Sequence, residues 1–257
     1  MYQKQTVIKG KTITSAFLMA PMVTFGYGVK NGIITDELIS HYEARARGGI
    51  GMIIAEAACV AEDGRLSEYQ TGIWNEDQME GHRMLVSAAH KFKVPILSQL
   101  HHAGIRTVSG RPASPSAFHG TLRGREYTAD EMSEDEILLR EQQFIEAAVR
   151  ARAAGYDGVE LHCAHSYFLN AFLSPTVNHR TDRFGGNIEG RMRVVLDIME
   201  GIRHSCGENF LISVRLGFNE PDLESSAFMA GTFEKAGMDF LHVSTGFGST
   251  GFMDERT

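Results

Sequence analysis

Six short apolar runs recur along the chain, and each is bounded by Gly, Asp or Pro residues. They cover residues 16–22, 51–57, 94–100, 157–163, 209–215 and 239–244. Apolar residues fill these runs without strict alternation, which is typical of parallel strands whose two faces are both covered. The runs therefore predict six buried strands of an α/β fold.

Amphipathic segments separate the apolar runs and predict helices. The first spans Asp36 to Arg47, with Thr35 as its N-cap and Gly48-Gly49 as its stop. Ser133 and Glu136 form a capping-box pattern at the start of a long helix. That long helix is predicted at about 133–154, and further helices are predicted at about 76–91, 189–205 and 223–236. Strands and helices thus alternate as expected for parallel β/α units.

The β/α alternation fits either an open doubly wound sheet or a barrel. The first turn lacks the G-x-G-x-x-G fingerprint, and polar residues end several strands, which favours the barrel. We predict a TIM (β/α)8-type barrel that forms one domain over residues 1–257. About six of its eight strands are present, so the domain is expected to be incomplete at its C-terminal end. Gly10-Lys11 predicts the turn of an N-terminal β-hairpin that closes one end of the barrel.

Charge and cysteine content narrow the functional class. The net charge of -7 combines 25 basic and 32 acidic residues that are scattered along the chain, which argues against a nucleic-acid partner. The polar N-terminus predicts no export, and no stretch approaches the roughly 18 apolar residues of a membrane span. Cys59, Cys163 and Cys206 suggest neither a disulfide framework nor a metal pair, so a cytoplasmic location is expected.

The densest group of reactive side chains follows the fourth predicted strand. His162, His165 and Tyr167 lie within six positions of one another at its carboxyl end. Imidazoles can hydrogen-bond a carbonyl oxygen that gains negative charge, and a phenol can deliver a proton. A purely structural interpretation is also open, in which one histidine caps the strand end and Tyr167 packs with Phe168.

Two further polar residues lie at strand ends: Gln99 closes the third predicted strand, and Arg215 closes the fifth. The Gln99 amide offers a donor and an acceptor, which suits a heterocycle with alternating N–H and C=O edges. Either residue alone is often structural, because glutamine bonds backbone groups and arginine pairs with carboxylates. Together with the histidines, they are expected on the barrel face that carries active sites.

The sequence contains five motifs in a fixed order: APM (20–22), EAACVAEDGR (56–65), QLHHAG (99–104), ELHCAHSYFLNAFLSPTVNHRTDRFGGN (160–187) and SVRLG (213–217). In these motifs the chain resembles the Old Yellow Enzyme family of flavin oxidoreductases, over nearly its whole length. The long motif is highly specific, whereas APM or QLHHAG alone is weak. The branch it resembles most contains bacterial NADH:flavin oxidoreductases and the barrel domains of enoate and 2,4-dienoyl-CoA reductases.

This resemblance implies FMN as cofactor and NADH or NADPH as hydride donor. The residues implied to lie against the flavin ring are Pro21, Met22, Val23 and Ala57. Gln99 would bond the pyrimidine edge, and Arg215 would place a positive charge near flavin N1 and O2, which favours the reduced anion. Val23 stands where relatives often carry Thr or Cys, so its missing hydrogen bond implies altered redox tuning.

The resemblance also implies a substrate and a reaction. The substrate would be a small α,β-unsaturated carbonyl compound whose oxygen is held by His162 and His165, with Tyr167 as proton donor. Hydride would pass from the nicotinamide to flavin N5 and then to the β-carbon. The histidines would stabilise the enolate character of the carbonyl without reorganising. A homo-oligomer is possible, and no metal is expected in the site.

Two alternatives remain open from the sequence. His101, His102, His162 and His165 on one barrel face could ligate a divalent metal, as in barrel hydrolases. His101 and His102 could equally support a loop from a second layer. The other alternative is a catalytically weak barrel fragment that needs a partner segment, because phosphate-binding loops of many barrels follow strands seven and eight.

Overall fold

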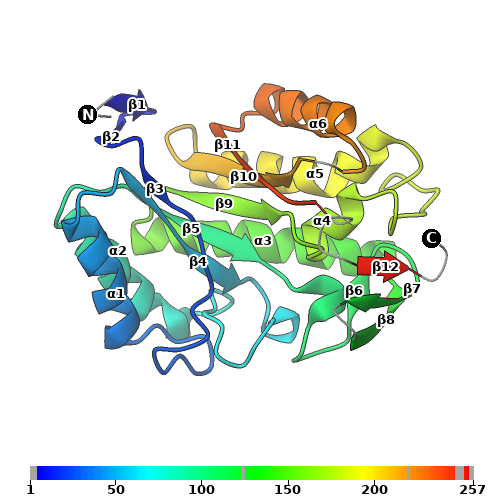
Figure 1. Cartoon of the computed structure of the whole chain (residues 1–257), viewed down its shortest axis with the longest axis horizontal. Coiled ribbons are helices and arrows are strands. Elements are labelled where there is room, and N and C mark those ends of the chain that lie inside the picture. Colours follow the sequence, from blue (N-terminus) through cyan, green and yellow to red (C-terminus); the bar gives the residue numbers. More distant parts are fainter. Residues whose placement is uncertain (1–4, 123–124, 219, 247–251, 255–257) are drawn as a thin grey trace.

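The computed structural model describes residues 5–122, 125–218, 220–246 and 252–254. Its centre is a curved sheet of six parallel strands in the order β11-β10-β9-β5-β4-β3 (Figure 1). The strands are β3 (Leu18–Met19), β4 (Met52–Cys59), β5 (Ile96–His101), β9 (Gly158–Cys163), β10 (Leu211–Gly217) and β11 (Phe240–Ser244). The six predicted strands are therefore confirmed as one parallel sheet, part of a TIM-type barrel.

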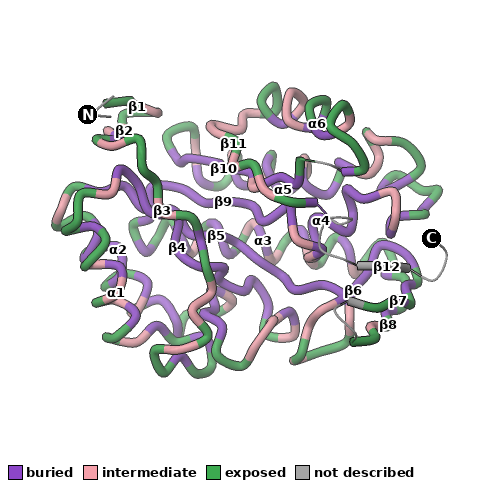
Figure 2. Tube along the Cα trace, viewed as in Figure 1, coloured by how far each residue is buried: buried purple, intermediate pink, exposed green. Residues whose placement is uncertain are grey.

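The middle strands of this sheet are covered on both faces, as their continuous apolar sequences require. Every residue of β4, β5 and β9 is buried. Ile53, Val159 and Ile212 belong to the core shared with the helices, whereas Met52 and Leu97 belong to a separate cluster inside the curve of the sheet. Figure 2 shows the buried middle strands beside less buried edges.

Helices lie around the outside of the curved sheet (Figure 1). They are α1 (Asp36–Arg47), α2 (Met79–His90), α3 (Glu134–Ala154), α4 (Phe168–Leu173), α5 (Ile188–Cys206) and α6 (Leu223–Lys235). Thr35 caps α1 by accepting a bond from the Leu38 amide, and Ser133 forms the predicted capping box with Glu136 on α3. The predicted helix at 76–91 begins as a 3₁₀ turn, Glu76–Gln78, before α2.

The N-terminal hairpin pairs β1 (Thr6–Ile8) with β2 (Lys11–Ile13). Its turn is Lys9-Gly10, one residue earlier than predicted, since both residues have positive φ angles and Ile8 pairs with Lys11. Lys9 and Lys11 form ion pairs with Asp239 and Asp157, which precede β11 and β9. The hairpin therefore covers the amino ends of the strands, opposite their carboxyl ends.

A second sheet was not predicted from the sequence. It has the order β12-β7-β8-β6, with β6 (Ala113–Ser114), β7 (Phe118–Leu122), β8 (Arg125–Glu131) and β12 (Phe252–Asp254). Only Ala129 of β8 is buried, so this strand carries no clear apolar periodicity. Short 3₁₀ turns at Glu62–Gly64 and Gly104–Arg106 complete the loops beyond β4 and β5.

Candidate functional site

A pocket of about 230 Å³ lies at the carboxyl ends of the central strands. The predicted site residues that line it are Pro21, Met22, Val23, Ala57, Gln99, His162, His165, Tyr167 and Arg215. Phe25, Leu66 and His101 complete the lining. The structure thus gathers all nine predicted residues around one cavity, although they span nearly two hundred positions of sequence.

Strand register explains how these side chains meet. Arg215 of β10 pairs with His162 of β9, and Gln99 of β5 pairs with Glu160 two positions before His162. Because side chains alternate across a strand, Glu160 and His162 face the same side, toward the inside of the barrel. Ala57 lies at a register shift in the pairing of β4 with β5, where irregular strand geometry re-aims side chains.

Three aromatic rings, two imidazoles and one phenol, pack edge to face at one end of the pocket. The His162 ring centroid lies 5.0 Å from both the His165 and Tyr167 centroids. His101 adds a fourth ring, 4.4 Å from Tyr167. Such tilted pairs fix each ring in place without consuming its polar atoms. Among the described residues, His162 Nδ1 and His101 Nε2 have no hydrogen-bond partner, whereas His165 Nε2 contacts Ser244 Oγ.

The tautomer of His101 follows from its neighbour. The amide nitrogen of Gln70 lies 2.9 Å from His101 Nδ1, and an amide nitrogen can only donate. The Gln70 oxygen is occupied by the Leu66 amide at 2.7 Å, which fixes this amide orientation. His101 Nδ1 is thus the acceptor, and its Nε2 carries the hydrogen, a buried donor without a partner among the described residues.

The loop after β9 holds an uncommon backbone shape. His165 and Ser166 both have positive φ angles, 63° and 61°, which non-glycine residues rarely adopt. Asn170 accepts a bond from the Ser166 amide at 2.8 Å, and Arg106 donates to the His165 carbonyl at 3.3 Å. This strain is held by surrounding bonds, as is common where a loop must aim functional side chains.

Burial sets the charge state of the pocket. It holds the pKa of His162 well below its usual range, and neighbouring positive groups add to this effect. Burial, followed by the charge of Arg215, lowers the pKa of His165 to about 4. Burial also raises the pKa of Tyr167. At neutral pH both imidazoles are therefore uncharged and the phenol keeps its proton, so all three can act as neutral donors.

Arg215 supplies the positive charge of the pocket. Its Nη1 donates to the Pro21 carbonyl at 3.3 Å, which connects β10 to the loop after β3. Its Nε, like His162 Nδ1 and His101 Nε2, is buried without a partner among the described residues. Three buried nitrogens around one pocket fit an oxygen- and nitrogen-rich ring such as the flavin, because buried polar groups are normally hydrogen-bonded.

His102 lies apart from the pocket. Its Nδ1 accepts a bond from the Gly104 amide at 2.9 Å, and its ring packs on Phe168. A Cβ at Gly64 would meet the His102 ring at 2.3 Å, so only glycine permits this packing. His102 thus supports loops, whereas His101 faces the pocket. Among the residues that the structure describes, no group of three or more His, Cys, Asp or Glu side chains is arranged to hold a metal.

The stretch from Asn178 to Gly186 is a structural loop. Arg180 is buried and bonds Asp182 and the carbonyls of Pro115 and Met132. Asn178 donates to the carbonyls of Phe172 and Phe184. These contacts fix the shape of this charged loop.

Sequence reasoning missed four residues around the pocket: Phe25, Leu66, Arg106 and Ser244. Arg106 lies 4.8 Å above the Tyr167 ring, and Ser244 Oγ is 2.6 Å from His165 Nε2. Arg106 follows the QLHHAG motif closely, which was the available signal. Ser244 ends the last predicted strand, at the same barrel face as Arg215, so its position was equally informative.

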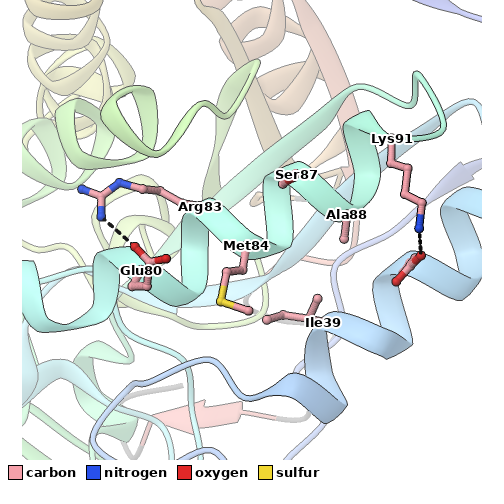
Figure 3. Close-up of a pocket in the computed structure, with 8 residues that line it drawn as sticks. Ile39, Glu80, Arg83, Met84, Ser87, Ala88 and Lys91 are labelled. Carbon is pink, nitrogen blue, oxygen red and sulfur yellow. Dashed lines mark hydrogen bonds and ion pairs between the residues drawn. The ribbon is translucent and has the colours of Figure 1, made fainter.

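A larger hollow of about 470 Å³ lies elsewhere, between α1 and α2 on the outer surface (Figure 3). Its charged side chains pair with each other, Arg83 with Glu80 and Lys91 with Glu43. No strand end contributes to its lining. This surface therefore has no part in the site at the carboxyl ends of the strands.

The fold and the pocket define a class, the parallel-barrel oxidoreductases with a flavin-type site at the strand ends. Residues 6–243 match the model of the NADH:flavin oxidoreductase / NADH oxidase family, so the chain belongs to that family. The predicted resemblance to Old Yellow Enzyme relatives is confirmed. Membership favours FMN and a nicotinamide donor over the metal-hydrolase alternative.

Two curated relatives show the extent of the match. The chain is 38% identical to an NADH oxidase of Thermoanaerobacter brockii, over 91% of this chain and 37% of that protein. It is 36% identical to an NADPH dehydrogenase of Halalkalibacterium halodurans, over 93% of this chain and 71% of that protein. The chain thus spans just over a third of the first relative and under three quarters of the second.

Two solved structures also superpose on this chain over nearly its whole length. The old yellow enzyme homologue from Zymomonas mobilis superposes with a TM-score of 0.85 at 27% identity, over 93% of this chain and 72% of that one. A 2-naphthoyl-CoA reductase in complex with 2-naphthoyl-CoA superposes with a TM-score of 0.91 at 25% identity, over 96% of this chain and 40% of that one. Both likenesses extend over nearly all of this chain.

Proposed function

We propose that the protein is an FMN-dependent ene-reductase, which uses NADH or NADPH to reduce the activated C=C bond of an α,β-unsaturated carbonyl compound. The observation that carries this proposal is the convergence of nine predicted residues on one pocket with three unpartnered buried nitrogens. Family membership supports the cofactor and the donor. When bound, FMN supplies a hydride carrier between the nicotinamide and the alkene.

The histidines of the pocket activate the substrate. His162 and His165 donate hydrogen bonds to the carbonyl oxygen, which gains negative charge as the β-carbon is reduced. Because burial keeps both imidazoles neutral, each offers one N–H and loses no proton to the oxygen. Donors fixed before the reaction stabilise this charge without reorganising.

Tyr167 delivers the proton. Its raised pKa keeps the phenol protonated, and Arg106 above its ring limits the positions that the side chain can take. We propose that Tyr167 protonates the α-carbon. Gln99 and Arg215 hold the ring of the cofactor, Gln99 through its amide and Arg215 through its charge. The loop from Pro21 to Val23 and the side chain of Ala57 cover the ring.

A second proposal concerns affinity. Ligand pockets usually enclose roughly 300–1,000 Å³, and the cavity here encloses about 230 Å³, enough for part of a cofactor. β3 and β11 leave open edges among the described strands, and Val243 on β11 is 59% exposed. We propose that the chain, with these open edges, binds FMN more weakly than a closed-barrel relative and self-associates through them. Light scattering and FMN titration measure both.

Partner and location follow from the same chemistry. We propose a small unsaturated carbonyl compound as the substrate. A cytoplasmic location suits NADH or NADPH as donors and the three buried cysteines, none of which forms a disulfide. The described residues contain no helix long and apolar enough to cross a bilayer.

The test of the proposed activity separates its two halves. Under anaerobic conditions, NADH or NADPH should bleach the flavin absorption of the FMN-loaded protein, and a small cyclic enone should restore it. The expected product is the saturated ketone. Bleaching without reoxidation by any enone would contradict alkene reduction and leave only a flavin reductase.

A further inference from the structure

Glu160 is a fully buried carboxylate at the centre of the barrel interior, beneath the pocket. It receives bonds from three other strands. Gln99 Nε2 on β5 lies 2.8 Å from one oxygen, Ser213 Oγ on β10 lies 3.0 Å from the other, and His242 Nδ1 on β11 lies 3.0 Å from that second oxygen. A buried charge is tolerated only when its lone pairs are satisfied in this way.

These bonds determine which way the Gln99 amide faces. A carboxylate can only accept, so it must face the amide nitrogen of Gln99 rather than the oxygen. No described residue donates to Gln99 Oε1. Gln99 lines the pocket, so its oxygen is the polar atom left for a ligand. The Glu160 carboxylate thus selects one of the two amide orientations.

Glu160 also lies one layer below the charged end of the pocket. Ser213 pairs with Glu160 in the register of β10 and β9, and Arg215 pairs with His162 two positions further along. The negative charge of Glu160 therefore supports the positive charge of Arg215. Burial lowers the pKa of the Arg215 guanidinium, and the charge of Glu160 opposes that effect.

We propose that Glu160 is a positioning residue of the flavin pocket, which turns the oxygen of Gln99 toward the N–H edge of the ring. This inference rests on the proposed function, because it requires a ring with N–H and C=O groups in the pocket. Glu160 does not touch the ligand; it acts through Gln99. His242 and Ser213 hold the carboxylate in the orientation that this role needs.

Glu160→Gln tests the role, because it keeps the shape but replaces an acceptor with a group that can also donate. The Gln99 amide can then turn its oxygen inward. FMN affinity of the chain, measured by quenching of flavin fluorescence, should weaken about tenfold, the loss expected for one misoriented hydrogen bond. In a Gln99→Ala background the same substitution should change affinity less than twofold.

Glu141→Gln is the matched control, since it makes the same change at a buried carboxylate of α3 away from the pocket. It should leave FMN affinity unchanged. Thermal unfolding of each FMN-free variant checks folding. If Glu160→Gln does not fold, His242→Ala replaces it, because it removes a donor from the same carboxylate. His242→Ala should weaken FMN binding at least twofold when Gln99 is present. In the Gln99→Ala background the same substitution should weaken it less than twofold.

The outcomes separate the positioning role of Glu160 from the proposed FMN-dependent function. Binding of FMN by the unchanged chain, with no loss in a folded Glu160→Gln, overturns the positioning role alone. An equal loss with and without Gln99 also overturns it, because Glu160 would then act independently of the amide. Failure of the unchanged chain to bind FMN overturns the proposed function and, with it, this role.

Discussion

The two walls of the pocket differ in the chemistry of their side chains and in the structural elements that carry them. The polar wall, made of Gln99, His101, His162 and Arg215, is carried by strands in the body of the sheet. The apolar wall, made of Pro21, Met22, Val23 and Phe25, is a loop beyond the short edge strand β3. Gln99 and His101 are 1% exposed, whereas Met22 is 72% and Phe25 51% exposed.

This difference assigns separate tasks to the walls. Fixed dipoles in a buried site act on developing charge without reorganising, so the polar wall should control the chemical steps. The apolar wall has no side-chain donor at its four positions and should control cofactor contact and fine tuning. Substitutions in the two walls should therefore differ in the step they affect and in the size of the effect.

The largest effect is expected from His162→Ala combined with His165→Ala. Losing a donor to a developing oxyanion typically costs about 100-fold or more in rate. Reduction of an enone by the reduced protein should slow at least that much, whereas reduction of the flavin by NADH or NADPH should change little. Stopped-flow measurement of each half-reaction checks this.

His204→Ala is the control for the histidine pair, because His204 is exposed on α5 outside the pocket. Both of its half-reactions should match those of the unchanged protein. Equal slowing of the two half-reactions in the double variant would point to general damage of the pocket and remove the substrate role of the pair.

Arg215→Met should have the next largest effect. It removes the positive charge of the polar wall and so disfavours the anionic reduced flavin. The flavin potential should fall, and reduction by the nicotinamide should slow on the order of tenfold, or about 1.4 kcal/mol. Arg203→Met, at an arginine that bonds the carbonyls of Phe210 and Gly237 before β10 and β11, is the control. An unchanged potential would place Arg215 away from the ring.

The polar wall was largely predictable from sequence. Gln99, His162 and Arg215 end apolar runs, and parallel strands bring such ends to one edge. His101 was considered beside His102, but strand alternation alone did not decide which of the two faces the pocket. Their separation depends on Gly64, which admits the His102 ring, and on Gln70, which bonds His101. Both lie in the loops after β4.

Acid should lower the free energy of unfolding through His165, which lines the pocket beside the polar wall. Unfolded histidine binds a proton below about pH 6.5, but folded His165 does so only near its lowered pKa of about 4. Unfolding therefore takes up a proton in this window, and the stability that neutral His165 contributes is present above pH 6.5 and lost down to about pH 4. The unfolding midpoint of His165→Gln should depend less steeply on pH between these limits. If the unfolding midpoints of the unchanged protein and of His165→Gln depended equally on pH, that result would contradict a neutral His165 imidazole.

The smallest effect is expected from Val23→Thr in the apolar wall. It adds a hydroxyl donor beside the ring, worth about 0.5–1.5 kcal/mol if it bonds the reduced flavin. For a two-electron couple this raises the potential by roughly 10–30 mV. Val23→Ala should leave the potential unchanged, since it adds no donor. A shift in both variants would indicate a packing effect.

The parts of the fold that sequence reasoning missed lack an apolar signal. β7 and β8 form a largely exposed hairpin, and β8 buries only Ala129, so its strand period is hidden. Phe25 and Leu66 reach the pocket from loops, where no periodicity indicates direction. Strand ends could be placed because their geometry is regular, whereas loop residues depend on contacts between distant segments.

The visible absorption spectrum of the freshly purified protein, with and without added FMN, tests the central claim most directly. We expect a yellow protein, or one that takes up FMN with the absorption changes of a flavin moved from water into a buried ring site. Gln99→Ala combined with Arg215→Met should weaken that uptake strongly. A folded, colourless protein that leaves the spectrum of added FMN unchanged would contradict the account.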